Sequence, residues 1–338
     1  MRETVDLHNR LFGELRVSVT DRCNFRCFYC MPDDRYTLVE RSELLTYEEI
    51  ERVVLISTRL GVTKVRLTGG EPLVRKNLAV LVERLSIISE IKDLSITTNG
   101  SYLAAQALSL WRAGLKRINV SLDTLDPDKF HRTTKRGRLA DVISGLMAAR
   151  EAGFTNIKLN AVVTRGGHEE DILRLVDFAT ENRFTIRFIE YMDVGNTNGW
   201  ASDQIVSKKE IVQIIKTRYR LRELGREKVG GTAIAYELEG AGCIEVIASV
   251  TEPFCSDCMR ARLTADGRVV TCLFSQQGHD LRPLIRGGAT DGEIEQEIRA
   301  IWEKREDRYS EKRAEAILSP AGFHTGNYKK IEMIQLGG

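Results

Sequence analysis

A short run of β-branched residues followed by an amphipathic stretch occurs six times in the first two thirds of the chain. The expected strands cover residues 15–20, 64–70, 94–100, 117–123, 157–163 and 184–192, and the expected helices cover 46–61, 77–88, 103–114, 141–153, 169–182 and 207–219. Successive strand–helix units predict a parallel sheet with right-handed crossovers. The fold is therefore expected to be α/β, either a doubly wound sheet or a complete or partial barrel.

The pattern changes after about residue 218, where strands follow one another. They are expected over residues 233–240, 243–250 and 260–274, the last as a hairpin that turns at Asp266-Gly267, and a helix is expected over 291–306. We therefore divide the chain into residues 1–217 and residues 218–338.

Polar residues gather where the expected strands end. The motifs TDRCNFRC, TGGEP, TTNG, SLD and EYM end or follow strands one, two, three, four and six, and Asn160 lies within strand five. In parallel α/β folds the functional site is built at the carboxyl ends of the strands. This clustering indicates an enzyme.

The overall charge and the cysteine content narrow the function classes. A net charge of +2 gives no electrostatic reason to expect a nucleic-acid partner, and the apolar runs are too short to span a bilayer. The first residues, MRETVDLHNR, have no apolar core, so no secretory signal is expected. The seven cysteines, an odd number, then fit metal ligation or catalysis in a reducing cytoplasm better than a disulfide framework.

Three of these cysteines fall within eight positions of the segment DRCNFRCFYCMP. Cys23, Cys27 and Cys30 form a C-x3-C-x2-C pattern on the loop after the first expected strand. A structural zinc site needs four ligands, so it would take a fourth residue from elsewhere. A four-iron cluster held by three thiolates would instead keep one iron open to a small molecule. Spacing alone leaves both interpretations open.

A second group of three, Cys255, Cys258 and Cys272, forms a C-x2-C-x13-C pattern in the last third of the chain. A zinc site completed by His279 is one interpretation. An electron-relay cluster with four protein ligands is less favoured, because Cys243 would have to travel to complete it. We expect Cys243 to be a small buried residue.

The residues around the first trio resemble the radical S-adenosylmethionine (SAM) superfamily. Tyr29 directly precedes the third cysteine, and GGEP over residues 69–72 ends the second strand, as in that superfamily. The resemblance implies that the open iron of a [4Fe-4S] cluster binds SAM. Reductive cleavage of SAM then gives methionine and a 5′-deoxyadenosyl radical.

Nearly the whole chain, from about residue 6 to Gly337-Gly338, is similar to one family of that superfamily. The segments that carry the likeness are LRVSVTDRCNFRCFYCMP, KVRLTGGEPLVR, TTNG, INVSLDTLDP, IKLNAVV, RFIEYMDVG and FCSDCMRARLTADGRVVTCLF. They resemble the molybdenum cofactor biosynthesis protein A (MoaA) family, the GTP 3′,8-cyclases. The resemblance implies a partial (β/α)6 barrel over residues 1–217. It also implies a C-terminal α+β part over 218–338 with a second [4Fe-4S] cluster, whose open iron holds the guanine base.

The same resemblance assigns site residues by position. The six cysteines of the two trios would ligate the clusters. The implied SAM contacts are Tyr29, Gly70, Ser121 and Met192, and the implied GTP contacts are Arg16, Arg66, Thr97, Lys158, Arg260, Ala261 and Arg262. The terminal Gly337 and Gly338 are expected to reach the pocket.

The implied reaction is a lyase reaction in which the radical removes hydrogen from C3′ of the GTP ribose and C3′ attacks C8 of guanine. It gives 3′,8-cyclo-7,8-dihydro-GTP, and it implies no catalytic side chain beyond the cluster and SAM site. The expected partners are an electron donor and the cyclic pyranopterin monophosphate synthase, which takes the product. A cytoplasmic homodimer is expected.

Two other functions compete with this one. A different radical SAM enzyme with an auxiliary cluster, such as one that modifies peptides, would have no use for the arginines of MRARL. A zinc-stabilised nucleic-acid-binding protein would show a basic face, whereas this chain is nearly neutral overall.

Overall fold

The computed structural model describes residues 3–31, 36–226, 230–318 and 329–337. Its strands are β1 (Glu14–Ser18), β2 (Lys64–Thr68), β3 (Asp93–Thr98), β4 (Arg117–Ser121), β5 (Asn156–Val163), β6 (Thr185–Glu190), β7 (Leu221–Gly225), β8 (Ile234–Leu238), β9 (Gly242–Ile247), β10 (Arg260–Leu263), β11 (Arg268–Val270) and β12 (His279–Asp280). Its helices are α1 (Tyr47–Arg59), α2 (Leu78–Ser86), α3 (Leu103–Arg112), α4 (Pro127–Thr134), α5 (Leu139–Glu151), α6 (Ile172–Asn182), α7 (Lys208–Lys216), α8 (Arg282–Arg286), α9 (Asp291–Glu303), α10 (Tyr309–Leu318) and α11 (Met333–Leu336).

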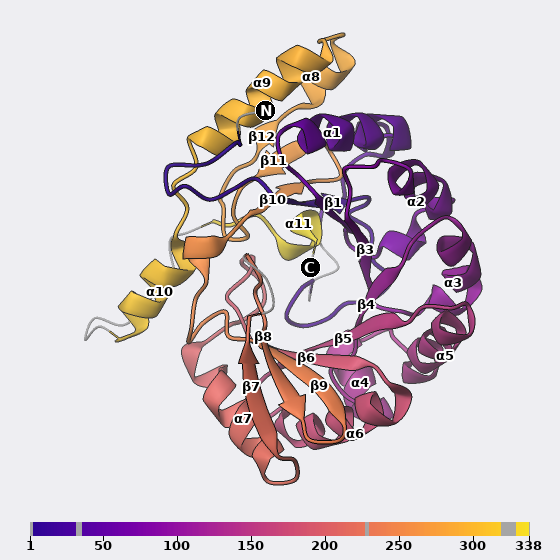
Figure 1. Ribbon diagram of the computed structural model, residues 1–338, viewed down its shortest axis with the longest axis vertical. Helices are drawn as coiled ribbons and strands as arrows, with labels where there is room; N and C mark the ends of the chain where they lie inside the picture. Colours follow the sequence, from indigo (N-terminus) through magenta and orange to yellow (C-terminus); the bar gives the residue numbers. More distant parts are fainter. Residues whose placement is uncertain (1–2, 32–35, 227–229, 319–328, 338) are drawn as a thin grey trace.

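Strands β1 to β6 are neighbours in chain order and run parallel. Figure 1 shows them as a curved wall, with α1 to α6 on its outer side. All six expected strand–helix units are present, and the partial (β/α)6 barrel is confirmed.

The C-terminal strands add to both ends of this same sheet. Strand β10 pairs in parallel with β1, and strand β9 pairs in parallel with β6. Antiparallel β11 and β12 continue beyond β10, while β8 and β7 continue beyond β9. The expected hairpin at Asp266-Gly267 joins β10 to β11. One sheet therefore runs through both parts of the chain.

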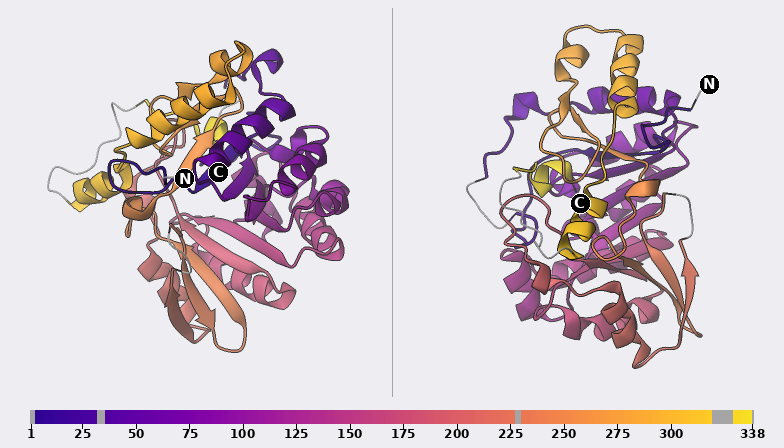
Figure 2. Two further views of the ribbon diagram at one scale, coloured as in Figure 1. Left: turned by 45° about the horizontal axis from the view of Figure 1, so that its top comes forward. Right: turned by 90° about the vertical axis from the view of Figure 1, so that its left-hand side faces the viewer.

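Local sequence signals start the helices. Helix α1 begins with a capping box in which the Thr46 side chain accepts from the Glu49 N–H, and the Glu49 carboxylate accepts from the Thr46 N–H. Helices α7 and α9 begin in the same way at Ser207 and Thr290. Figure 2 shows α9 beside α1, where Arg52 donates to Asp291 at 2.8 Å.

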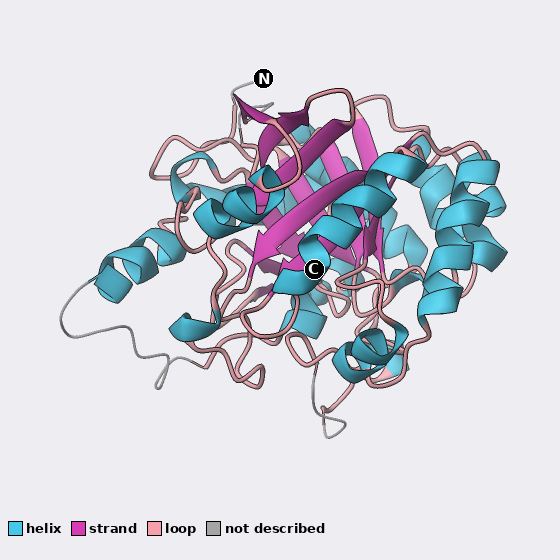
Figure 3. Cartoon of the chain, turned by 90° about the horizontal axis from the view of Figure 1, so that it is seen from below, coloured by secondary structure: helices cyan, strands magenta, loops and turns pink. Residues whose placement is uncertain are grey.

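Side-chain alternation along the strands separates the core from the cavity. Leu15 and Val17 of β1 are buried in the hydrophobic core that the helices cover, whereas Arg16 between them lines the cavity. Figure 3 shows the helices packed around the strands from another side. The outer face of the sheet therefore supplies stability, and its inner face supplies the site.

Cys243 was expected to be buried and is exposed, so that expectation was wrong. It is the second residue of β9 and pairs with Glu237 near the turn of the β8–β9 hairpin. This end of the hairpin lies beyond the packed core. Within the described ranges, every helix is too short or too polar to cross a membrane.

Candidate active site

One cavity at the carboxyl ends of the parallel strands reaches both cysteine trios. Its lining includes Cys23, Cys27, Cys30, Cys255, Cys258 and Cys272. It also includes nine of the other residues assigned from the sequence: Arg16, Tyr29, Arg66, Gly70, Thr97, Ser121, Met192, Arg260 and Arg262. Residues distant in the chain thus form one site, as expected for this edge of a parallel sheet.

The first trio lies on the loop after β1, and the GGEP segment fixes that loop. The Gly70 N–H donates to the Thr20 carbonyl at 2.7 Å, and the Glu71 N–H donates to the Arg22 carbonyl at 2.8 Å. A Cβ on Gly70 would collide with the Arg22 carbonyl oxygen. Glycine is therefore needed here because the cysteine loop lies directly on the backbone.

Buried hydrogen bonds hold the walls around the first trio. The Tyr29 hydroxyl donates to Asp123 Oδ2 at 2.7 Å, and Asp123 Oδ1 accepts from the Val162 N–H at 2.8 Å. Glu71 accepts from the Thr98 hydroxyl and from the Asn99 N–H, both at 2.6 Å. Burial raises the pKa of Glu71 to about 7. Asp123, just after β4, thus joins the cysteine loop to β5, and Glu71, just after β2, joins that segment to the end of β3.

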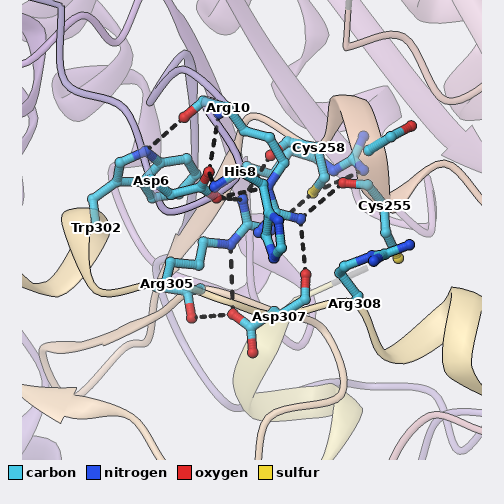
Figure 4. A network of polar contacts seen from close by, with 12 residues as sticks. Asp6, His8, Arg10, Cys255, Cys258, Trp302, Arg305, Asp307 and Arg308 are labelled. Atoms are coloured by element: carbon cyan, nitrogen blue, oxygen red, sulfur yellow. Dashed lines mark hydrogen bonds and ion pairs between the residues drawn. The ribbon is translucent and has the colours of Figure 1, made fainter.

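Residues of the N-terminal segment and Arg305, just beyond α9, contact the loop that carries Cys255 and Cys258. Figure 4 shows Asp6, Arg10 and Arg305 gathered against Cys255 and Cys258. Arg10 Nη1 donates to the Cys255 carbonyl at 2.8 Å, and Arg305 Nη1 donates to the Cys258 carbonyl at 2.7 Å. Asp6 Oδ2 accepts from Arg10 Nε at 2.6 Å and from Arg305 Nη1 at 3.3 Å.

Two guanidinium groups also point at the Cys258 sulfur. Arg260 Nη2 and Arg305 Nη2 each lie 3.2 Å from Cys258 Sγ. Burial alone would raise the pKa of Cys258, but the charges of Arg260 and Arg305 lower it to about 6. Burial raises the pKa of Cys272 to about 12 and that of Cys23 to about 11. The six residues are free thiols, the donor type that iron–sulfur clusters use.

The arrangement argues against a zinc ion held by the second trio and His279. Among the residues that the structure describes, no group of three or more His, Cys, Asp or Glu residues could hold a single metal ion. His279 lies exposed on the edge strand β12. A four-iron cluster takes each thiolate on a different iron, so it fits donors that do not converge on one point.

Three arginines lie in a row on the cavity wall. Arg16 of β1 is the register partner of Arg262 on β10 and of Arg66 on β2. Burial lowers the pKa of Arg16 and of Arg66 to about 10. Like charges in directly opposite positions of a sheet destabilise it. A row of this kind favours an anionic ligand.

Several buried polar atoms on the same wall lack a partner in the described structure. They are Arg66 Nε, Arg262 Nε, Thr97 Oγ1 and Asn160 Oδ1, all from residues that line the cavity. A buried polar group without a hydrogen bond costs about 1–3 kcal/mol. A ligand that offers both donors and acceptors would satisfy this wall.

Two of the assigned GTP contacts do not line the cavity. Lys158 lies on β5, and its Nζ donates to Glu245 Oε1 at 2.5 Å. Ala261 is fully buried on the opposite face of β10 from Arg260 and Arg262. The sequence reasoning also missed Arg187 of β6, which lines the cavity and donates through Nε to Glu245 Oε2 at 2.6 Å. Its place inside RFIEYM was the available signal, because a cation within a buried strand needs a partner.

The C-terminal tail enters the curve of the sheet, where Figure 1 places α11. Met333 lines the cavity, and the Gly337 N–H donates to the Met333 carbonyl at 2.9 Å. Gly337 has φ +71°, and a Cβ there would lie 2.7 Å from the Thr68 hydroxyl and 3.0 Å from the Gly69 nitrogen. Gly338 lies outside the described residues.

Lys330 anchors this tail in the protein. Its buried ammonium donates to the Asp193 carbonyl and to Asp193 Oδ2, both at 2.6 Å. The guanidinium of buried Arg313 and the Tyr309 hydroxyl also reach the Asp193 carboxylate. Asp193 therefore joins the loop after β6, α10 and the tail.

Two family models match successive parts of the chain. Residues 17–179 match the family described as Radical SAM superfamily, and residues 184–311 match the family described as Molybdenum Cofactor Synthesis C. A protein of Acidothermus cellulolyticus described as GTP 3′,8-cyclase is 45% identical, over 98% of either chain. Proteins of the same description are 43% identical in Xanthomonas axonopodis pv. citri, over 98% of either chain, and 40% in Staphylococcus epidermidis, over the full length of both.

A solved structure shares the fold at low sequence identity. Streptococcus suis SuiB bound to S-adenosylmethionine superposes with a TM-score of 0.61 at 18% identity, over 87% of this chain and 69% of that one.

Proposed function

The chain belongs to the GTP 3′,8-cyclase family, and we propose that its cavity binds GTP between the two cysteine trios. The family's activity, radical SAM cyclisation of GTP to 3′,8-cyclo-7,8-dihydro-GTP in molybdenum cofactor biosynthesis, is the activity of this chain. One observation carries the proposal: both trios and a row of three arginines line the same cavity.

SAM and an iron–sulfur cluster belong to this activity. We assign Cys23, Cys27 and Cys30 to that cluster, and Tyr29, Gly70, Ser121 and Met192 to the SAM side of the cavity. Bound there, cluster and SAM supply the radical that removes hydrogen from the GTP ribose. The residues of this chain would hold and orient the reactants and exclude water, which lowers the part of the barrier that comes from bringing reacting atoms together. Gly70 serves this role by allowing the cysteine loop to lie on the backbone of GGEP.

Cys255, Cys258 and Cys272 would hold a second four-iron cluster, with an iron open to the guanine base. Three observations support this assignment: the trio lines the cavity, its members do not converge on a single ion, and Arg305 and Arg260 face the Cys258 sulfur. Hydrogen bonds from outside a metal site orient its ligands and tune the bound metal.

The triphosphate of GTP would lie along the arginine row. Arg16, Arg66 and Arg262 present adjacent cations, and the unpartnered Arg66 Nε, Arg262 Nε and Thr97 Oγ1 offer hydrogen bonds to it. Lys158 and Arg187 would reach it from the β5–β6 side of the cavity. Ala261 would contribute through its backbone. The tail would close the pocket, with Gly337 against Gly69 and Gly338 beyond it.

The remaining partners are proposals from family membership. An electron donor must reduce the first cluster, and the cyclic pyranopterin monophosphate synthase would take the product. A homodimer is likewise proposed from family membership. The cysteines of the two trios form no disulfides in the described structure, which fits the proposed reducing cytoplasm.

A peptide-modifying radical SAM enzyme is the competing function. The likeness to SuiB shows the fold alone, and a neutral peptide would leave the arginine row without its counter-charge. The two functions separate in one experiment. Anaerobically purified protein is mixed with SAM, dithionite and GTP, and the nucleotide is analysed by mass spectrometry. Formation of 3′,8-cyclo-7,8-dihydro-GTP supports the proposal. SAM cleavage without any change in GTP would overturn it.

A further inference from the structure

Glu245 of β9 is a buried carboxylate between Arg187, which lines the cavity, and Lys158, which does not. Its side chain is 6% exposed, and it is the register partner of Arg187 on β6. Oε1 accepts from Lys158 Nζ at 2.5 Å, and Oε2 accepts from Arg187 Nε at 2.6 Å. Burial alone would raise the pKa of Glu245, but Arg187 and Lys158 hold it below the usual value. The carboxylate is therefore charged.

The Glu245 side chain lies on the inner face of the sheet, two residues before the residue of β9 that lines the cavity. Ile247 and Ile189, two residues further along β9 and β6, line the cavity, as does Arg187 itself. Asn160, two residues beyond Lys158 on β5, lines it too. Since side chains two apart on a strand share a face, Lys158 and Glu245 face the same space as the proposed triphosphate.

A second carboxylate occupies the matching place on the other side. Glu14 of β1 accepts from Arg16 Nε at 3.1 Å and lies 3.7 Å from Arg66 Nη2. Glu14 thus pairs with Arg16 and Arg66, just as Glu245 pairs with Lys158 and Arg187. The four cations Arg16, Arg66, Lys158 and Arg187 therefore share two carboxylates, and these six groups together keep an excess of positive charge.

We propose that Glu245 is an internal counter-ion of the polyphosphate site, which holds Lys158 and Arg187 in place without nucleotide and weakens the binding of the triphosphate. The proposal rests on the function proposed above. A carboxylate between two cations substitutes for part of a phosphate group in the empty site. Once a polyanion binds, the same carboxylate competes for Lys158 and Arg187 and repels the incoming charge. Glu245 would therefore be a positioning residue that limits affinity.

The test compares GTP with guanosine, which has no phosphate, by isothermal titration calorimetry on the anaerobic holoenzyme. In Glu245→Gln, we expect the Kd for GTP to fall by roughly tenfold, because one repulsive charge near the phosphates is gone. The affinity should also depend more steeply on salt concentration. The Kd for guanosine should stay unchanged. A residue that only supports the fold would not separate the two ligands.

Glu237→Gln on the neighbouring strand β8 is the matched control. Its carboxylate pairs with Arg222 in an ion pair that is largely exposed, so GTP binding should remain as in the wild type. Glu245→Asp keeps the buried charge and provides a second test if the Glu245→Gln variant does not fold. The shorter Asp cannot reach both cations, so GTP should bind more tightly than in the wild type, but less tightly than in Glu245→Gln.

The outcomes distinguish this inference from the proposed function. If the wild type binds GTP and guanosine equally well, the triphosphate does not lie on this wall, and the proposed nucleotide position fails. If the wild type prefers GTP but folded Glu245→Gln and Glu245→Asp bind it equally or more weakly, only the role of Glu245 is overturned.

Discussion

Arg16 and Arg262 are register partners on the parallel strands β1 and β10, so two guanidinium groups of like charge lie side by side, with Arg262 buried and Arg16 partly buried. Burial and the charge of Arg16 lower the pKa of Arg262 to about 9. The ligand-free protein therefore carries an unfavourable pair of charges at this place, and a bound polyanion would compensate it.

Replacing Arg262 with Gln should remove this repulsion together with a phosphate contact. We expect GTP affinity to fall by roughly ten- to a hundredfold, since one charged hydrogen bond is worth about 1.5–3 kcal/mol. The unfolding temperature without ligand should stay equal or rise. Calorimetric titration and thermal melts measure the two effects. Arg268→Gln, at a half-exposed residue on β11, is the control. A variant at position 262 with wild-type GTP affinity would move the triphosphate elsewhere.

Alanine at Gly337 should displace the tail without affecting the fold. The new Cβ would collide with Thr68, and φ +71° disfavours a side chain. We expect cyclised product per SAM cleaved to fall by roughly tenfold or more, because small misplacements of reacting atoms are costly. Gly240→Ala has a similar φ of +74° but open space around its Cβ, so it should lose no activity. Equal product yields in the two variants would show that Gly337 is not part of the site.

The two trios should load iron independently. Protein purified without oxygen is expected to hold about eight irons, the sum for two four-iron clusters. Cys23→Ala and Cys272→Ala should each retain about half of that iron, whereas Cys243→Ala, at an exposed residue, should retain all of it. Iron and sulfide analysis gives the counts. Retention of all the iron in Cys272→Ala would rule out a second cluster on that trio.

Replacing Arg305 with Met should weaken iron binding by the second trio and leave iron binding by the first trio unchanged. The change removes the hydrogen bonds to the Cys258 carbonyl and sulfur. It also removes one of the two guanidinium partners of the buried Asp6, which keeps Arg10 and the His8 N–H. We expect part of the second cluster's iron to be lost during purification, with the first cluster unchanged. Electron paramagnetic resonance of the reduced protein separates the two signals. Arg222→Met, in a largely exposed ion pair with Glu237 between β7 and β8, should behave as the wild type. Equal iron loss in both variants would contradict a specific role for Arg305.

Methionine at Lys330 should loosen the tail at its anchor. Without the ammonium, Asp193 keeps Arg313 and Tyr309, so the loop after β6 should hold. We expect faster hydrogen exchange over residues 333–337, because that segment loses one of its attachments and keeps the bonds of Asn196 and Ser275 to residues 330–332. Lys329→Met, at the exposed neighbouring residue, should leave exchange unchanged. Identical exchange in both variants would mean that other contacts hold the tail.

Much of the fold could be predicted because its signals are local. β-branched runs, glycine ends and capping pairs such as Thr46 and Glu49 lie within a few residues of one another, and the barrel follows from their order. Each cysteine trio could also be recognised within one short segment of sequence. The pairing of β10 with β1 joins residues about 250 positions apart, and local patterns carry no trace of it.

Partners of buried charges were the harder part of the site. Lys158 could be assigned as an inward cation, but Glu245, 87 residues later, has no motif around it that indicates a shared contact. Arg10 and Arg305 lie in an N-terminal segment and just beyond α9, without a recognisable pattern, yet both contact the second trio. Cys243 was misjudged because a thiol in an apolar run is usually buried, whereas this one is near a hairpin end.

The order in which the strands join the sheet has a consequence for synthesis on the ribosome. Translation up to Lys216 at the end of α7 yields all six barrel strands, but both outer edges, at β1 and β6, then carry unpaired backbone groups. Exposed edges of this kind invite pairing with other chains. Strand β9 covers one edge, and β10, which directly follows Cys255 and Cys258, covers the other. A nascent chain therefore exposes an edge prone to aggregation until β10, the strand that also contributes Arg260 and Arg262 to the cavity, has been synthesised.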